Sequence, residues 1–96
     1  MAIQSFGDKA TEMLYLTGVP PRSAGWRAVA TVALRKLDMV SYAKDLDDLK
    51  APPNNRLEKL KGDLSGFHSI RINDQWRIVF MWTGNGPCEV RIIDYH

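Results

Sequence analysis

The chain has 96 residues, of which 45% are hydrophobic and 25% are charged. This length supports one domain with a single modest core, and the composition is typical of a folded globular protein rather than a disordered segment. Its 13 basic and 11 acidic residues give a net charge of only +2, so the total charge alone does not indicate a nucleic-acid partner, and the clustering of charges must decide.

The sequence argues against three classes of protein: membrane-spanning, secreted and zinc-binding. No apolar run approaches the roughly 20 residues of a spanning helix, and the start, MAIQSFGDKA, lacks the basic and apolar regions of a secretory signal. Cys88 is the only cysteine, so neither an internal disulfide nor a structural zinc site is expected. We therefore expect a cytoplasmic protein that uses no metal and no other cofactor.

The first half of the chain predicts one short strand and two helices. Residues 3–6 alternate in polarity and predict the strand. Asp8 is placed to cap a helix that ends near Leu16, just before a Thr-Gly pair. From Ser23 to Val40, apolar residues recur at helical spacing and predict a longer second helix. Its opposite side is expected to carry Arg27, Arg35 and Lys36.

Residues 42–55 separate this helical half from a strand-rich half. Acidic residues and two prolines there predict a loop, in which residues 46–49 are able to form one helical turn. Beyond the loop, strands are predicted at residues 56–61, 67–72, 76–82 and 88–93. The second and third of these form a hairpin around Asn73-Asp74-Gln75. The order predicts an α+β fold, residues 1–96 as a single domain, with two helices on one face of a mostly antiparallel sheet of four to five strands.

The strand-rich half also predicts a cluster of cations. Alternation along the hairpin places Arg71 and Arg77 together on the sheet face away from the helices, and Lys59 and Lys61 share a parity on the adjoining strand. With Asn73 nearby, the four cations form a candidate phosphodiester site, since guanidinium forks match phosphate oxygens and lysines add point charge. The alternative is that they only solvate an exposed sheet face.

The two histidines have different settings. His68 has core parity, and we expect it to be structural. His96 follows Asp94 and Tyr95 at the end of the chain, where a frayed polar tail is the ordinary expectation. Alternation places Asp94 and His96 on the core parity, opposite Arg77, so a shared site requires the last residues to leave the pleat or to be re-aimed by a bulge.

Three motifs carry a resemblance to a known family: LKGD at residues 60–63, SIRINDQWRI at 69–78 and the terminal DYH at 94–96. Together they resemble the HigB-type toxins of the RelE/ParE superfamily, which belong to toxin–antitoxin modules. The likeness extends over nearly the whole chain. It implies a ribosome-dependent endoribonuclease that cuts messenger RNA and is neutralised by a HigA-type helix-turn-helix antitoxin.

The resemblance also implies site residues, one position at a time. Lys61 matches the lysine of the LKGD motif and Arg77 the arginine of the family's WRI motif, and both are implied to contact the scissile phosphate. Asp94, Tyr95 and His96 match the family's terminal acid, phenol and imidazole. Further RNA contacts are expected from Lys59, Arg71 and Asn73.

One position departs from the family pattern. Some relatives carry a histidine two residues before the leucine of LKGD, where this chain has Glu58. Glu58 either substitutes for that histidine as a carboxylate or leaves its role to His96 and Lys61.

These residue types support metal-free RNA cleavage, in which a base removes the 2′-hydroxyl proton, cations stabilise the phosphorane charge and an acid protonates the leaving 5′-oxygen. His96 is the first acid–base candidate, because the ordinary pKa of histidine, roughly 6.5, lies near working pH. Asp94 would orient it, and Tyr95 would stack on the RNA or hydrogen-bond to it.

Two other functions stay open. A ParE-like protein that binds DNA gyrase without catalysis would need neither His96 nor Lys61, so these residues favour the nuclease. A plain binding module leaves the motifs unexplained. Ribosome dependence is predicted because the chain has few catalytic groups and a low net charge. The basic residues expected to contact the ribosome are Lys9, Arg22, Arg27, Arg35 and Lys36.

Overall fold

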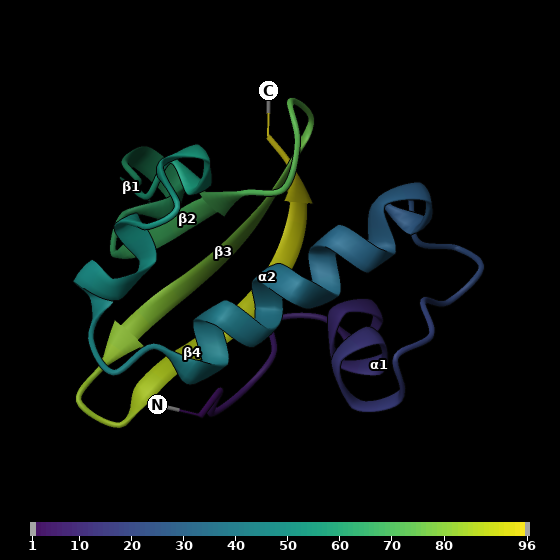
Figure 1. Ribbon diagram of the computed structural model, residues 1–96, viewed down its shortest axis with the longest axis horizontal. Helices are drawn as coiled ribbons and strands as arrows, with labels where there is room; N and C mark the ends of the chain where they lie inside the picture. The colour runs from purple at the N-terminus through teal and green to yellow at the C-terminus, as the bar shows by residue number, and fades with distance from the viewer. Residues whose placement is uncertain (1, 96) are drawn as a thin grey trace.

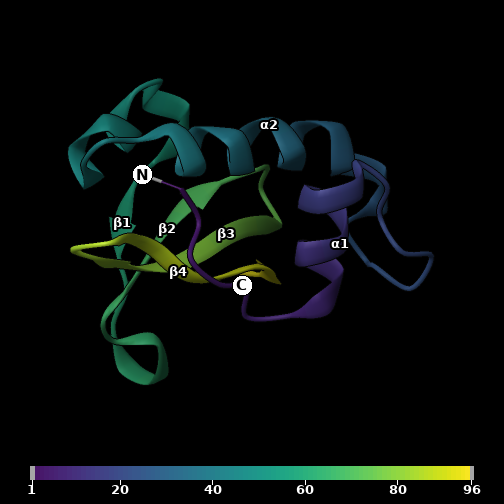
Figure 2. The ribbon, with the colours of Figure 1, turned by 90° about the horizontal axis from the view of Figure 1, so that it is seen from below.

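The computed structural model describes residues 2–95 and shows helices packed on one face of a four-stranded sheet (Figure 1). Its main elements are α1 (Lys9–Thr17), α2 (Ala30–Tyr42), β1 (Glu58–Lys59), β2 (Phe67–Arg71), β3 (Trp76–Thr83) and β4 (Gly86–Asp94). The strand order is β1-β2-β3-β4, and every neighbouring pair is antiparallel. Figure 2 shows α2 lying across one face of this sheet, which confirms the predicted α+β fold.

Helix α1 forms where local signals predict it. The Asp8 side chain accepts a hydrogen bond from the Thr11 amide (2.8 Å), and Gly18 ends the helix in the left-handed region at φ 76°. A left-handed C-terminal position favours glycine because no Cβ is present to clash. The buried Thr11 hydroxyl accepts a bond from the Ile92 amide (3.0 Å), so this helix is tied directly to β4.

Helix α2 begins later than predicted, at Ala30 instead of Ser23. The preceding residues form an irregular segment that ends in a 3₁₀ turn at Arg27–Val29. Within this segment Gly25 lies so close to the indole of Trp76 that a Cβ there would come within 3.0 Å of the ring. The segment therefore packs on the sheet, and this contact is not visible in helical periodicity.

Lys36 is buried, although the sequence placed it on the solvent side of α2. Its side chain is 5% exposed, and its Nζ donates to Oδ1 of the fully buried Asn55. Lys36 follows Ala33 by three residues and precedes Val40 by four, so it belongs to the core-facing stripe of the helix. Burial lowers the pKa of Lys36, and the charge of Arg35 acts in the same direction.

The strand predicted at residues 3–6 is reduced to a single parallel bridge between Phe6 and Val90. The cause is a bulge in β4, where the register with β3 shifts by one residue and Glu89 has a positive φ of 53°. The bulge lets the Val90 amide donate to the Ser5 carbonyl (3.1 Å). The Gln4 amide also donates to the Pro87 carbonyl and the Gly7 amide to the Val90 carbonyl (both 2.8 Å), so the amino-terminal segment lies along β4 without forming a full strand.

The first strand of the sheet, predicted at residues 56–61, covers only Glu58–Lys59. Arg56 has a positive φ of 47° after a 3₁₀ turn at Pro53–Asn55, which delays the extended backbone. Leu60 still donates from its amide to the Phe67 carbonyl (2.9 Å) before the chain turns again. β1 is therefore a short edge strand.

The core lies between α2 and the sheet. Its largest fully buried members are Leu14, Leu37, Val40, Leu49, Ile70, Ile78, Phe80 and Val90. Ile78 and Phe80 alternate with Arg77 and Val79 along β3, so the helix-facing parity predicted for this strand is confirmed. Among the helices in residues 2–95, none is both long and apolar enough to cross a membrane.

Candidate functional site

Arg77, on β3, lies at the centre of the candidate site, and its surroundings differ from the open surface that the sequence predicted. The residue is only 7% exposed. Its Nε donates to Ser69 Oγ (2.8 Å), its Nη2 donates to the Arg56 carbonyl (2.6 Å), and its Nη1 lies 3.5 Å from Glu58 Oε1. The guanidinium is therefore fixed in the sheet surface and is not a mobile surface group.

Tyr95 follows β4 and lies against this guanidinium. The Cζ of Arg77 is 5.3 Å from the centre of the Tyr95 ring, a distance typical of a cation–π contact. Ile93 pairs with Arg77 across the sheet, so alternation two residues later brings Tyr95 to the same face. Tyr95 thus reaches Arg77 by simple alternation, without leaving the pleat.

Asp94 lies on the opposite parity, as the sequence predicted. It pairs with Trp76 across the sheet, and its Oδ2 accepts a hydrogen bond from Gln75 Nε2 (2.9 Å). Asp94 and Tyr95 therefore point to different sides of the sheet end. His96, the main acid–base candidate, lies outside the described residues.

The electrostatics of Arg77 follow from its burial. Burial lowers the pKa of Arg77, while the charge of the nearby Glu58 carboxylate acts in the opposite direction. A guanidinium still keeps its proton at neutral pH, because its ordinary pKa exceeds roughly 12. The result is a permanent positive charge in a poorly solvated position, where its field is stronger than at an exposed surface.

Arg71 joins Arg77 in the candidate site. The two residues are directly paired between β2 and β3, so they share a sheet face, as predicted. Arg71 forms an ion pair with the exposed Asp74 in the adjacent turn. The structure thus brings Arg71, Arg77 and Tyr95 together.

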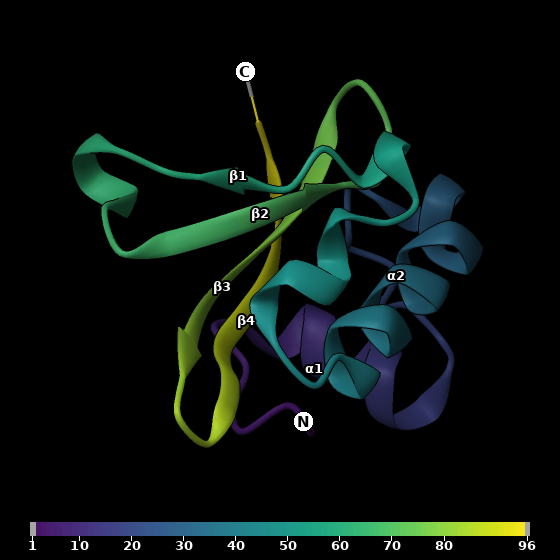
Figure 3. The same cartoon turned by 60° about the vertical axis from the view of Figure 1, so that its left-hand side comes forward.

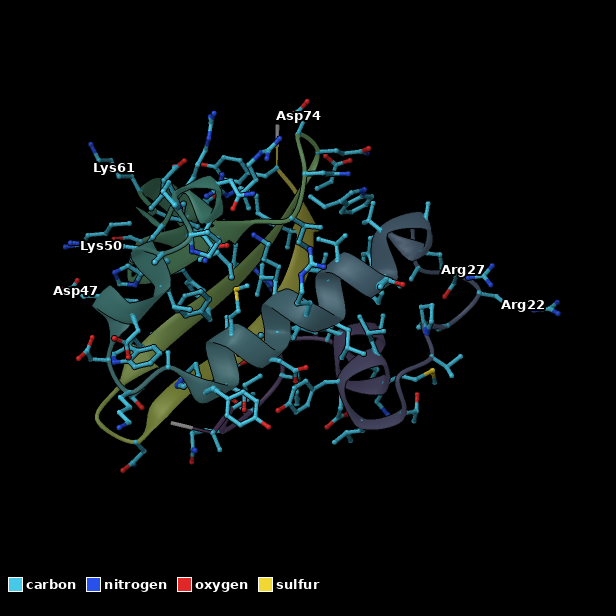
Figure 4. All side chains as sticks on the ribbon, viewed as in Figure 1. Arg22, Arg27, Asp47, Lys50, Lys61 and Asp74 are labelled. Atoms are coloured by element: carbon cyan, nitrogen blue, oxygen red, sulfur yellow. The ribbon has the colours of Figure 1, made fainter. Side chains whose placement is uncertain are left out.

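The two lysines do not join this group, so the predicted cluster of four cations is wrong. Lys59 pairs with His68, which pairs in turn with the core residue Phe80; the register places Lys59 on the other face of the sheet. Lys61 follows β1 and is exposed; Figure 4 shows its side chain directed away from the fold, far from Asp74 at the hairpin turn. The two ends of the five-residue strand β2 lie roughly 13 Å apart, and Lys61 is near the end away from Arg71.

Asn73 has a different environment from the one expected of a residue that only binds RNA. Its Oδ1 accepts hydrogen bonds from the amides of Gln75 (2.9 Å) and Trp76 (2.8 Å). The Asn73 side chain therefore shapes the hairpin turn.

Two neighbours of the site, Ser69 and Gln75, were not predicted from the sequence. The one signal available was that Ser69, a small hydroxyl residue, lies on the same predicted face as the two arginines.

Comparison with known proteins assigns the family. Residues 4–96 match the family model described as RelE-like toxin of type II toxin-antitoxin system HigB. The chain is 42% identical to Toxin HigB-1 of Vibrio cholerae over 55 aligned residues. This alignment covers 57% of this chain and 58% of that protein. It is 41% identical over 54 residues to an uncharacterized protein of Haemophilus influenzae, which covers 56% of this chain and 54% of that protein.

A solved structure shows the same fold. The YoeB-YefM complex from Staphylococcus aureus contains a chain that superposes with a TM-score of 0.59 at 20% identity, covering 100% of this chain and 97% of that one. The sequence comparisons align with somewhat more than half of each curated relative's length, whereas the family model extends over residues 4–96. The chain therefore belongs to the HigB-like family of RelE-like toxins of type II toxin–antitoxin systems.

Proposed function

We propose that this protein is the toxin of a type II toxin–antitoxin module and cleaves messenger RNA on the ribosome, by 2′-hydroxyl attack and without a metal. The observation that carries this proposal is the contact between Tyr95 and the buried Arg77, beside Arg71. An aromatic ring is suited to stack on a nucleotide, and the two guanidinium groups are suited to the charge of a phosphate.

The proposed reaction is a transesterification. The 2′-oxygen loses its proton and attacks the adjacent phosphorus, the bond from phosphorus to the 5′-oxygen breaks, and the leaving oxygen takes up a proton. Arg77 would stabilise the additional negative charge in the transition state, because its position is already fixed by Ser69 and the Arg56 carbonyl. His96 would supply the proton transfer to the leaving group.

Glu58 is the proposed base. Its carboxylate lies 3.5 Å from Arg77 and is about half exposed, so a 2′-hydroxyl held by the guanidinium would come within its reach. This assignment gives Glu58 the role that a histidine has in some relatives. Lys61 would contact the RNA backbone from the far end of β1, at a distance from the scissile phosphate.

The partners follow from the family and from the charge distribution. We propose a HigA-type helix-turn-helix antitoxin as the neutralising partner, and the ribosome with its messenger as the target, which places the protein in the cytoplasm. Arg22, Arg27 and Arg35 are exposed, and Figure 4 shows Arg22 and Arg27 projecting from the segment that precedes α2. These side chains are suited to a phosphate-rich surface such as ribosomal RNA.

The test compares one messenger RNA in two forms, free and bound in a programmed ribosome, with purified protein in single-turnover reactions. We expect cleavage on the ribosome and negligible cleavage of the free RNA, and we expect His96→Ala to abolish cleavage. Comparable rates on both forms would overturn ribosome dependence. Growth arrest with intact messengers and inhibited gyrase would replace the nuclease by the ParE-like alternative.

A further inference from the structure

We infer that Gln75 is a positioning residue: from the turn between β2 and β3 it holds Asp94 and Tyr95 where the candidate site needs them. The inference rests on the proposed function for its effect on cleavage. Its structural basis is a pair of contacts made by one residue. Gln75 Nε2 donates to Asp94 Oδ2 (2.9 Å), and the Gln75 carbonyl accepts from the Tyr95 amide (2.8 Å).

The two contacts act on both sides of one peptide bond. One fixes the side chain of Asp94, the last residue of β4, and the other fixes the backbone of Tyr95 just beyond it. Figures 1 and 3 show the β2–β3 turn beside the end of β4. The orientation of Tyr95 over Arg77 therefore depends on the position of this turn.

The turn is itself held firmly, which lets it serve as an anchor. Asn73 Oδ1 accepts from the amides of Gln75 and Trp76, and the Ile72 amide donates to the Trp76 carbonyl (2.9 Å). An asparagine that accepts from the residue two positions later stabilises a turn locally. Asn73 thus fixes the backbone of Gln75, and Gln75 fixes the chain end.

A residue with this role affects the rate more than the affinity. Tyr95 is 37% exposed and lies beyond the last strand residue, so without Gln75 its ring would sample several orientations relative to Arg77. Misplacement of a group by about 1 Å is enough to cost a large part of a catalytic rate. Ribosome binding, which the proposal assigns to exposed basic residues elsewhere, would be unaffected.

The experiment uses Gln75→Glu, which places a second carboxylate against Asp94, and Gln4→Glu as a matched control. Gln4 is the other glutamine of the chain; it is exposed, and its Nε2 donates to the Ala2 carbonyl. Three quantities are measured for each variant: hydrogen exchange of the Tyr95 amide by NMR, affinity for programmed ribosomes, and the single-turnover cleavage rate.

For Gln75→Glu we expect about tenfold faster exchange at Tyr95 and about tenfold slower cleavage, with unchanged ribosome affinity. Gln4→Glu should match the wild type in all three. The double variant Gln75→Glu with Asp94→Asn exchanges donor and acceptor, and it should restore the slow exchange at Tyr95.

Other outcomes would overturn the inference. Unchanged exchange in Gln75→Glu would mean that the side chain does not hold the chain end, and slower cleavage with unchanged exchange would point to direct substrate contact instead. Equal losses of cleavage rate in Gln75→Glu and Gln4→Glu would indicate a general effect of added negative charge. If the wild type cleaves nothing, the proposed function fails, but the exchange data and the double variant still decide whether Gln75 holds the chain end.

Discussion

The guanidinium of Arg77 is bound on three sides, by Ser69, the Arg56 carbonyl and Glu58. A buried charge is tolerated only where hydrogen bonds and an opposite charge replace the water that surrounded it. The same interactions that make Arg77 acceptable in the sheet also fix it under Tyr95. Stability and the proposed chemistry therefore depend on one side chain.

Replacement of Arg77 should lower both the stability of the fold and the cleavage rate. We expect Arg77→Ala to lower the free energy of unfolding by about 2 kcal/mol or more, because Ser69 and the Arg56 carbonyl lose a charged donor. Arg77→Lys keeps the charge but not the fork, and should lose most of the cleavage rate. Urea denaturation and single-turnover assays measure the two effects. The control is Lys50→Arg, at an exposed cation outside both the candidate site and the proposed ribosome surface. Wild-type activity in Arg77→Lys would mean that charge alone matters.

His68 is a structural histidine, as its parity predicted. It is half-buried, and its ring stacks on that of Phe80 with 6.3 Å between the ring centroids. Its Nδ1 has no hydrogen-bond partner within the described chain. Burial lowers the pKa of His68, and the charge of Lys59, directly across the sheet, lowers it further. The imidazole is therefore neutral in the folded state at physiological pH.

This shift predicts a pH dependence of stability. With the lower pKa in the folded state, the unfolded chain takes up the proton first as the pH falls below about 6.5, so stability decreases from there toward the folded-state pKa. Urea denaturation of wild type and His68→Leu between about pH 7.5 and 5.5 isolates the effect, because other groups titrate in both proteins. Parallel curves for the two proteins would show that His68 has the same pKa folded and unfolded.

At the scale of elements, local signals set α1 and long-range contacts set the strands. The cap at Asp8 and the glycine at position 18 act within one turn of the helix, and both lie where the sequence predicted them. The amino-terminal strand was predicted from equally local alternation and is reduced to one bridge. Its pairing depends on the bulge at Glu89, near the other end of the chain. The pattern of residues 3–6 carries no information about this bulge.

The cap gives a prediction for α1. Asp8→Ala should lower the free energy of unfolding by about 1 kcal/mol, because the Thr11 amide loses its acceptor. Asp8→Asn retains an acceptor oxygen and should cost clearly less. Urea denaturation of both variants provides the comparison, and equal losses would show that the negative charge of Asp8, not the hydrogen bond, stabilises the helix.

For the whole molecule, the fold decides which basic residues face a large anionic partner. Arg22 and Arg27 project into solvent ahead of α2, whereas Lys36, predicted to belong to the same surface, is buried against Asn55. Exposed cations that bind phosphates release counterions, but a buried one does not. The basic surface that we propose for ribosome binding is therefore smaller than the sequence suggested.

The salt dependence of ribosome binding tests this difference. The double variant Arg22→Gln, Arg27→Gln should flatten the slope of log affinity against log salt by roughly one for each phosphate that these arginines neutralise in the wild type. Lys36→Met should leave the slope unchanged, with urea denaturation confirming that it is folded. A slope change of the same size in Lys36→Met would place Lys36 in the binding surface.

Several features follow from the sequence alone, because they depend on neighbours in the chain. These are the α+β class, the ends of α1, the hairpin around residues 73–75, and the shared face of Arg71 and Arg77. In each case a cap, a turn or a two-residue period is sufficient. The motifs that resemble the family are equally local, and the family model matches them over residues 4–96.

The tertiary structure decided the features that depend on register and close approach. A shift of one residue between strands exchanges the faces of all side chains, so the sequence did not show that Lys59 lies opposite His68 and away from Arg77. The burial of Arg77 and Lys36 needed Arg56 and Asn55, which are distant in sequence from their partners. The anchoring of Asp94 by Gln75 likewise exists only where the end of β4 meets the hairpin turn, because the two lie 19 positions apart and the chain between them must fold back first.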